Sequence, residues 1–114
     1  MNNIHVDCVL DAKANLGEGP IWSIKDQNLY WVDINNCQLC KFNPVNGENI
    51  TINVGKPIGC FAIKKNLNII LALTNGFFEL NQNDKSMNFI NNPETNILDN
   101  RFNDGTVDLK GRFY

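Results

Sequence analysis

The fold is decided by the stretch Leu16-Gly-Glu-Gly-Pro-Ile-Trp22 and, after a polar turn, Leu29-Tyr-Trp-Val-Asp-Ile34. This stretch places one carboxylate, Glu18, between two glycines and directly before an apolar strand. Glycine lacks a Cβ, so the backbone beside Glu18 can bend sharply and lie close to a bound group. Pro20 fixes its own φ and has no N–H, which suits the start of a strand. The stretch therefore predicts a carboxylate held at the mouth of a β-strand.

The chain around this stretch consists of short apolar segments separated by turn residues. In the first unit, the sequence predicts four strands, at residues 21–24, 29–34, 38–42 and 50–54. The last of them alternates Ile-Thr-Ile-Asn-Val, the period-two pattern of a half-buried strand. The pattern returns at an offset of 40 residues, with strands predicted at 59–63, 69–73, 77–80 and 86–90. A third copy begins at Asp104-Gly-Thr-Val-Asp108 and turns at Lys110-Gly111.

Four-stranded units that repeat every 40 to 45 residues or so are typical of β-propellers, in which each unit is one blade. We therefore predict an all-β fold, a partial β-propeller of about two and a half blades. Blade one is expected at about 16–54, blade two at about 57–92 and the start of blade three at about 101–114. An ordinary sandwich of about eight strands fits the strand count but leaves the repeat unexplained. The segment 6–10 predicts one further strand.

Composition and charge narrow the class of protein. The chain has 114 residues, enough for one domain, with a net charge of −2 and no block of Lys and Arg. We therefore expect no nucleic-acid and no membrane partner. The most apolar run, residues 69–73, is far shorter than the ~20 residues of a membrane-spanning helix. The first residues have neither the basic start nor the apolar core of a signal peptide, so we expect a cytoplasmic protein.

The four cysteines do not form a recognisable metal site. Cys37 and Cys40 make one Cys-x-x-Cys pair, but no second pair or histidine cluster follows to complete a zinc site. We expect these residues, with Cys8 and Cys60, to be ordinary reduced cysteines that pack as small hydrophobes. The single histidine, His5, has no catalytic or metal-ligand spacing around it and is expected at the surface.

The repeat also makes a prediction about chemistry. Glu18 falls in register with Ile58 in the second unit and Asn103 in the third. The innermost strands line the central channel of a propeller, so residues just ahead of them should point at one mouth. Oxygen donors that converge there suit a hard divalent cation such as Ca²⁺, Mg²⁺ or Mn²⁺, with Zn²⁺ a further possibility. Arg101 should lie at the same rim and donate hydrogen bonds to a polar or anionic ligand.

Plain structural roles explain the same motifs when each is taken alone. The Asn-Asp-Gly sequence at 103–105 is typical of a turn, and Gly-Glu-Gly of a loop with a solvated carboxylate. Both interpretations remain open on the residues alone.

The motifs in series resemble those of the regucalcin (senescence marker protein)/gluconolactonase/luciferin-regenerating-enzyme family, and the match covers essentially the whole chain. The residues that carry the resemblance are the opening stretch, Pro57-Ile-Gly-Cys-Phe-Ala-Ile63, Asn75-Gly-Phe-Phe-Glu-Leu80, Asn100-Arg-Phe-Asn-Asp-Gly-Thr-Val-Asp108 and Gly111-Arg-Phe-Tyr114. The resemblance implies a six-bladed propeller with one divalent metal ion in its channel, often a sugar lactonase. It implies that Glu18 is a metal ligand and that Arg101 and Asn103 contact the substrate.

The resemblance also implies groups that these 114 residues lack. The Asn and Asp that complete the metal site, the Asp also serving as general base, are expected beyond Tyr114, as is a substrate-binding glutamate. No catalytic residue is therefore assigned within the chain. The implied reaction is lactone hydrolysis: the metal polarises the ring carbonyl, water attacks with the aspartate as base, and Arg101 and Asn103 orient the sugar.

Two hypotheses about function follow. In the first, the chain is the N-terminal portion of a divalent-metal-dependent lactonase that acts on a small sugar lactone. In the second, it is a degenerate, non-catalytic propeller fragment or a binding module. A calcium-binding regulatory role, without catalysis, uses the same channel. Because open blade edges expose unpaired backbone, we expect the 114-residue chain alone to be poorly stable, to self-associate and to be inactive.

Overall fold

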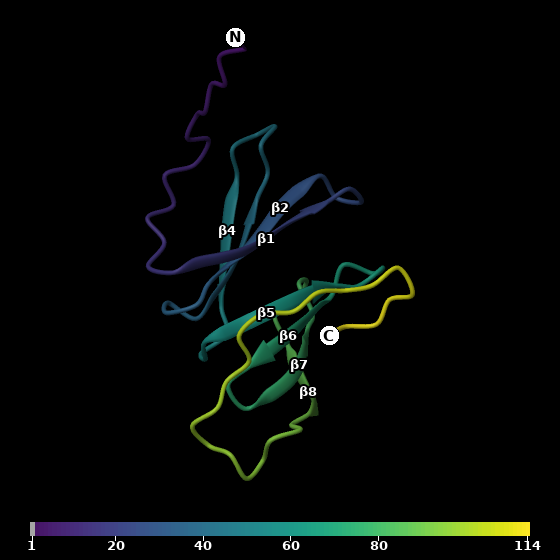
Figure 1. Cartoon of the computed structure of the whole chain (residues 1–114). Helices are drawn as coiled ribbons and strands as arrows, with labels where there is room; N and C mark the ends of the chain where they lie inside the picture. The colour runs from purple at the N-terminus through teal and green to yellow at the C-terminus, as the bar shows by residue number, and fades with distance from the viewer. Residues whose placement is uncertain (1) are drawn as a thin grey trace.

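The computed structural model describes residues 2–114, which form eight β-strands in two antiparallel sheets and no α-helix (Figure 1). The prediction of an all-β fold is confirmed. Within this described part of the chain, there is accordingly no helix with the length and apolar character needed to cross a membrane.

Each sheet is a meander, in which every strand pairs with the next one along the chain. The first sheet contains β1 (Gly17–Ser23), β2 (Asn28–Asp33), β3 (Gln38–Phe42) and β4 (Asn49–Asn53). The second contains β5 (Ile58–Ile63), β6 (Ile69–Leu73), β7 (Gly76–Leu80) and β8 (Met87–Asn91). Among residues 2–114 no strand crosses from one sheet to the other, so the sequential pairing is that of propeller blades rather than of a Greek-key sandwich.

The first strand of each sheet carries a β-bulge at the same place in the unit. Glu18 pairs with Val32, and the register then shifts before Ile21. Ile58 pairs with Leu73, and the register again shifts directly afterwards. A bulge bends its strand and re-aims the side chains beside it. The two sheets therefore share the position of this β-bulge as well as the same strand order.

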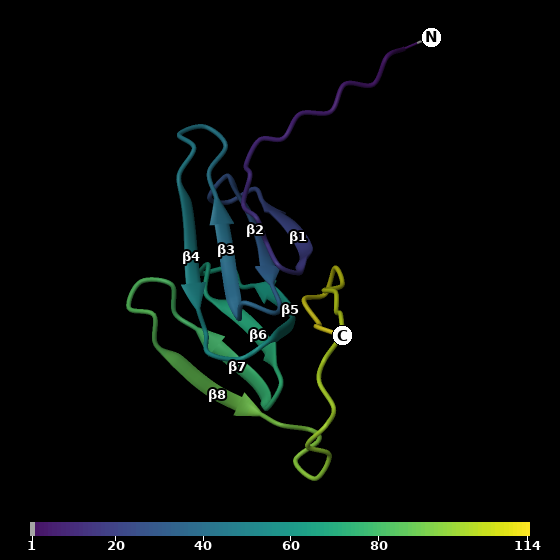
Figure 2. The same cartoon turned by 90° about the vertical axis from the view of Figure 1, so that its left-hand side faces the viewer.

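The hydrophobic core lies between the two sheets, one above the other in Figure 1. Figure 2 shows the strands of the first sheet side by side, from β1 to β4. Large side chains from both sheets are buried in this core because alternate residues of a strand point to the same face. The core consists of Tyr30, Val32, Ile34, Leu39, Val54, Ile58, Phe61, Ile69, Leu71, Leu73 and Leu80.

A polar cluster joins the sheets at the end of β1 opposite Glu18. The Tyr30 hydroxyl donates a hydrogen bond of 2.7 Å to Asp26 Oδ2, and Lys41 Nζ lies 3.1 Å from the same oxygen. Gln82, in the turn between β7 and β8, donates from Nε2 to the Tyr30 hydroxyl at 3.2 Å. Tyr30 is fully buried, so its ring belongs to the core while its hydroxyl links the first sheet to the second.

Two of the predicted strands differ from the structure. Residues 6–10 form no strand, and Val6 and Val9 are 83% and 73% exposed, because no neighbouring strand lies beside them to complete a ladder. In the third copy, a single bridge, Val107 to Phe113, forms in place of a full hairpin. After a loop that follows β8, the chain instead runs back along β5 as an irregular segment (Figure 1).

Candidate functional site

A cavity of about 160 Å³ lies where the start of β1, the bulge of β5 and the segment 101–104 meet. Its walls contain the three residues that the sequence singles out, Glu18, Arg101 and Asn103. The full lining is Leu16, Glu18, Gly19, Ile34, Gly59, Arg101, Asn103 and Asp104. The fold thus brings together side chains more than 80 residues apart in sequence. Their roles in binding metal or substrate remain predictions.

Glu18 lies within β1 rather than in a loop ahead of it. The strand begins at Gly17, four residues earlier than the apolar pattern indicates. Directly after Glu18, Gly19 adopts φ +59°, a left-handed conformation that favours glycine. This conformation belongs to the bulge, so the glycine positions the exposed Glu18 carboxylate at the mouth of the cavity.

Asp33 fixes the approach of the chain to Glu18. This carboxylate is 3% exposed and accepts hydrogen bonds from the backbone N–H of Asn15 (2.9 Å) and of Leu16 (3.0 Å), and from Asn36 Nδ2 (2.7 Å). Burial by itself would raise the pKa of Asp33, but the hydrogen bonds from Leu16, Asn15 and Asn36 outweigh it and lower the pKa below its ordinary value. Asp33 is therefore a structural carboxylate, held ionised behind the cavity.

The segment 101–104 forms the opposite wall. Arg101 Nη1 donates a 2.9 Å hydrogen bond to the carbonyl oxygen of its neighbour Phe102. Asp104 Oδ1 accepts from the N–H of Gly105 at 2.7 Å. Within residues 2–114, neither Glu18 nor Asp104 forms an ion pair with Arg101. The Arg101 guanidinium therefore keeps most of its donors available for a ligand.

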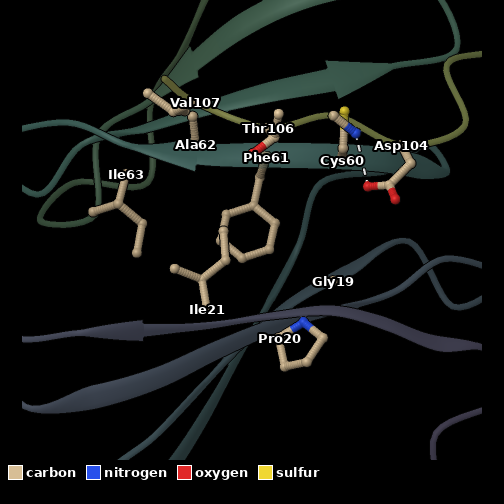
Figure 3. Close-up of a pocket in the computed structure, with 11 residues that line it drawn as sticks. Gly19, Pro20, Ile21, Cys60, Phe61, Ala62, Ile63, Asp104, Thr106 and Val107 are labelled. Carbon is tan, nitrogen blue, oxygen red and sulfur yellow. Dashed lines mark hydrogen bonds between the residues drawn. The ribbon is translucent and has the colours of Figure 1, made fainter. Parts of the chain in front are cut away.

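A second, larger cavity of about 410 Å³ adjoins the first and shares Gly19 and Asp104 with it. It lies between β1, β5 and residues 104–107. Figure 3 shows Ile21 and Phe61 facing each other across it, with Asp104 at one end. Its walls are mostly apolar, so the polar groups are concentrated at the Glu18 mouth.

The oxygen atoms that line the smaller cavity are of the type that a hard divalent cation prefers, but there are too few of them to complete its coordination shell. Glu18, Asn103 and Asp104 offer carboxylate and amide oxygens, the ligands that such ions prefer. Ca²⁺ takes about 6–8 oxygen ligands. Among residues 2–114 no group of three or more His, Cys, Asp or Glu side chains is arranged to hold a metal ion. This chain can therefore supply only part of a coordination shell.

Two positions depart from the sequence-based expectation for the site. Ile58, the register partner of Glu18, is fully buried in the core and does not line the cavity. The next residue, Gly59, lines it instead, because the bulge of β5 re-aims the backbone there. Asp104 was not singled out, since Asn-Asp-Gly also predicts a plain turn. The position of Asp104 directly after Asn103 is the sequence feature that could have identified it as a residue of the site.

Comparison with known proteins matches the chain to one family. The sequence model of the SMP-30/Gluconolactonase/LRE-like region matches residues 16–114. Regucalcin from Xenopus laevis is 35% identical over 113 residues, covering 99% of this chain and 38% of its own length. The 6-deoxy-6-sulfogluconolactonase of Pseudomonas putida is 34% identical over 112 residues, covering 98% of this chain and 38% of its own length.

The solved structure of a luciferin-regenerating enzyme superimposes with a TM-score of 0.80 at 27% identity, over 86% of this chain and 34% of that one. The prediction of a partial β-propeller is thereby confirmed. The chain spans 38% of the length of the curated relatives it matches. Since the family match covers almost all of the chain, the protein belongs to the SMP-30/gluconolactonase/LRE-like family.

Proposed function

We propose that this chain contributes the N-terminal part of the active site of a divalent-metal-dependent sugar lactonase, which hydrolyses the ring ester of a lactone. One observation carries the proposal: Glu18, Arg101 and Asn103 line a single cavity. The 34% identity to a sulfogluconolactonase supports the same reaction class. The substrate we propose is a small sugar lactone.

Five residues of the cavity have assigned tasks in this proposal. Glu18 would hold the metal ion through its carboxylate, and a bound divalent ion would supply Lewis-acid polarisation of the lactone carbonyl. Arg101 donates hydrogen bonds, and the Asn103 amide both donates and accepts them, which orients the sugar hydroxyls. Leu16 and Ile34 form an apolar wall beside these groups, and a low local dielectric strengthens their hydrogen bonds. The general base and the other metal ligands come from outside these 114 residues.

The test is a chimera in which residues 16–114 replace the matching segment of the Pseudomonas putida lactonase. We expect the chimera to hydrolyse that enzyme's lactone in a metal-dependent way, with activity lost on chelation and restored by Ca²⁺ or Mn²⁺. Glu18→Gln should reduce kcat/KM by about 100-fold or more, because it removes a charged ligand. The readout is the initial rate of lactone hydrolysis at several metal concentrations.

Glu48→Gln is the matched control, because Glu48 is an exposed carboxylate in the turn before β4. It should leave kcat/KM within about twofold of the parent chimera. The proposal fails if a folded chimera is inactive while the parent lactonase works. It also fails if Glu18→Gln retains full activity.

The 114-residue chain alone should behave differently from the chimera. We expect it to show no metal-dependent lactone turnover and to self-associate, because Trp22, Phe89 and Ile90 are 45%, 59% and 51% exposed on its sheets. Sedimentation velocity at several concentrations measures the association, and a lactone assay measures turnover. A concentration-independent monomer, or measurable turnover, would contradict these expectations.

A further inference from the structure

The segment 93–114 is held against the second sheet without polar contacts to the rest of the molecule. Within residues 2–114, each of its hydrogen bonds and its one ion pair, Arg112 to Asp108, has a partner in residues 92–114. None reaches residues 2–91. Packing alone therefore places the wall of the cavity that contains Arg101 and Asn103.

The closest packing occurs at Gly59, in the bulge of β5. A Cβ built on Gly59 would lie 2.1 Å from the carbonyl oxygen of Phe102, 2.5 Å from its carbonyl carbon and 2.9 Å from its Cβ. Two of these three atoms are backbone, which cannot rotate out of the way as a side chain can. The backbone of Phe102 thus crosses β5 at a residue that has no side chain.

Aromatic contacts also hold the segment from β7, which lies two strands from β5 in the same sheet. The ring of Phe77, in β7, lies with its centroid 4.5 Å from that of Phe102 and 6.2 Å from that of Phe113. Phe77 therefore contacts the segment at its middle, through Phe102, and near its C-terminal end, through Phe113. Between these contacts Gly105 lies over Cys60, since a Cβ on Gly105 would be 2.8 Å from the Cys60 Sγ.

We propose that Gly59 and Phe77 are positioning residues for Arg101 and Asn103. Together they fix the backbone of Phe102, which lies between the two. The Phe102 carbonyl that lies on Gly59 also accepts the hydrogen bond of the Arg101 guanidinium, so a displaced carbonyl moves the guanidinium with it. The inference rests on the proposed function, because it assigns Gly59 and Phe77 to the same site.

Cys60 provides a reporter of this packing in the 114-residue chain itself. The segment covers it, leaving it 8% exposed, whereas Cys40 is 3% exposed within the first sheet. Burial raises the pKa of both thiols to about 11, with a further contribution from Asp104 at Cys60 and from Asp33 at Cys40. Both thiols are thus buried with a raised pKa, and only Cys60 lies against the segment.

The experiment measures maleimide modification of Cys60 and Cys40 by mass spectrometry, in a Cys8→Ser, Cys37→Ser background. Gly59→Ala and Phe77→Ala should each raise the Cys60 rate by about tenfold or more, with the Cys40 rate unchanged, because only the segment is released. Phe77→Tyr keeps the ring and should stay near the parent rate. Cys60 rates at the parent level in both Ala variants would overturn the proposal, as would equal acceleration of the two thiols in Phe77→Ala.

The chimera described above tests the link to substrate. Gly59→Ala should raise KM for the lactone by about tenfold while kcat stays within about threefold, because the substrate contacts shift and Glu18 on β1 does not. The metal concentration for half-maximal activity should not change. A loss confined to kcat would contradict the positioning role. An inactive parent chimera would count against the proposed function alone, since the thiol rates still decide whether Gly59 and Phe77 hold the segment.

Discussion

Tyr30→Ala is expected to lower the free energy of unfolding by about 3–5 kcal/mol, the usual cost of removing a large aromatic side chain from a core. Tyr30 is fully buried between the sheets, and its hydroxyl connects Asp26 of the first sheet to Gln82 of the second. The substitution therefore opens a cavity and also breaks the polar link between the sheets. Urea unfolding followed by tryptophan fluorescence measures the change, at protein concentrations low enough to prevent association.

Of two further variants, the first separates packing from hydrogen bonding and the second is an exposed-site control. Tyr30→Phe keeps the ring and should cost only about 1–2 kcal/mol, because Asp26 retains Lys41. Tyr114→Ala removes a tyrosine that is 66% exposed and should change the unfolding free energy by less than about 0.5 kcal/mol. Equal losses for Tyr30→Phe and Tyr30→Ala would show that the hydroxyl, and not the ring, dominates.

Asp33→Ala should lower the free energy of unfolding by about 3 kcal/mol at neutral pH, because it leaves three donors without their charged acceptor. Asp33→Asn keeps one acceptor oxygen and should cost about 1–2 kcal/mol. In both variants the chain before Glu18 loses its anchor. The exposed Asp11 provides the control, since Asp11→Asn should stay within about 0.5 kcal/mol of the parent.

The effect of Asp33 should depend on pH in a defined direction. Its folded-state pKa lies below the ordinary value, so its contribution to stability is fully present above about pH 4 and is lost as the pH falls through the folded-state pKa. The difference between the parent and Asp33→Asn should therefore shrink between pH 7 and about pH 3. Urea titrations at the two pH values measure it, and an unchanged difference would contradict the assignment.

Much of the fold follows from local sequence pattern. Strands form at the alternating residues of 50–54 and at the apolar runs of 59–63 and 69–73. Each of them pairs with a strand to which a single connecting turn joins it. Residues 6–10 have comparable apolar content but no such neighbour, and they form no strand. Pattern alone cannot tell whether a pairing partner exists.

The candidate site was only partly predictable for a similar reason. The register between Glu18 and Asn103 came from the repeat, and both line the cavity. Ile58 occupies the equivalent place in the second unit but turns into the core. The role of Gly59 depends on how closely the Phe102 backbone approaches it, a tertiary contact between residues more than 40 apart that no local pattern encodes.

The cavity of Glu18 has walls from three separate parts of the chain: the first sheet, the second sheet and the segment that ends the chain. A ligand that contacts all three walls fills the cavity and also connects the three parts of the chain non-covalently. By thermodynamic linkage, its binding energy must also stabilise the association of the sheets with each other and with the segment. Ligand binding and the association of the three parts are thus thermodynamically coupled. A rise in melting temperature with ligand concentration would report both.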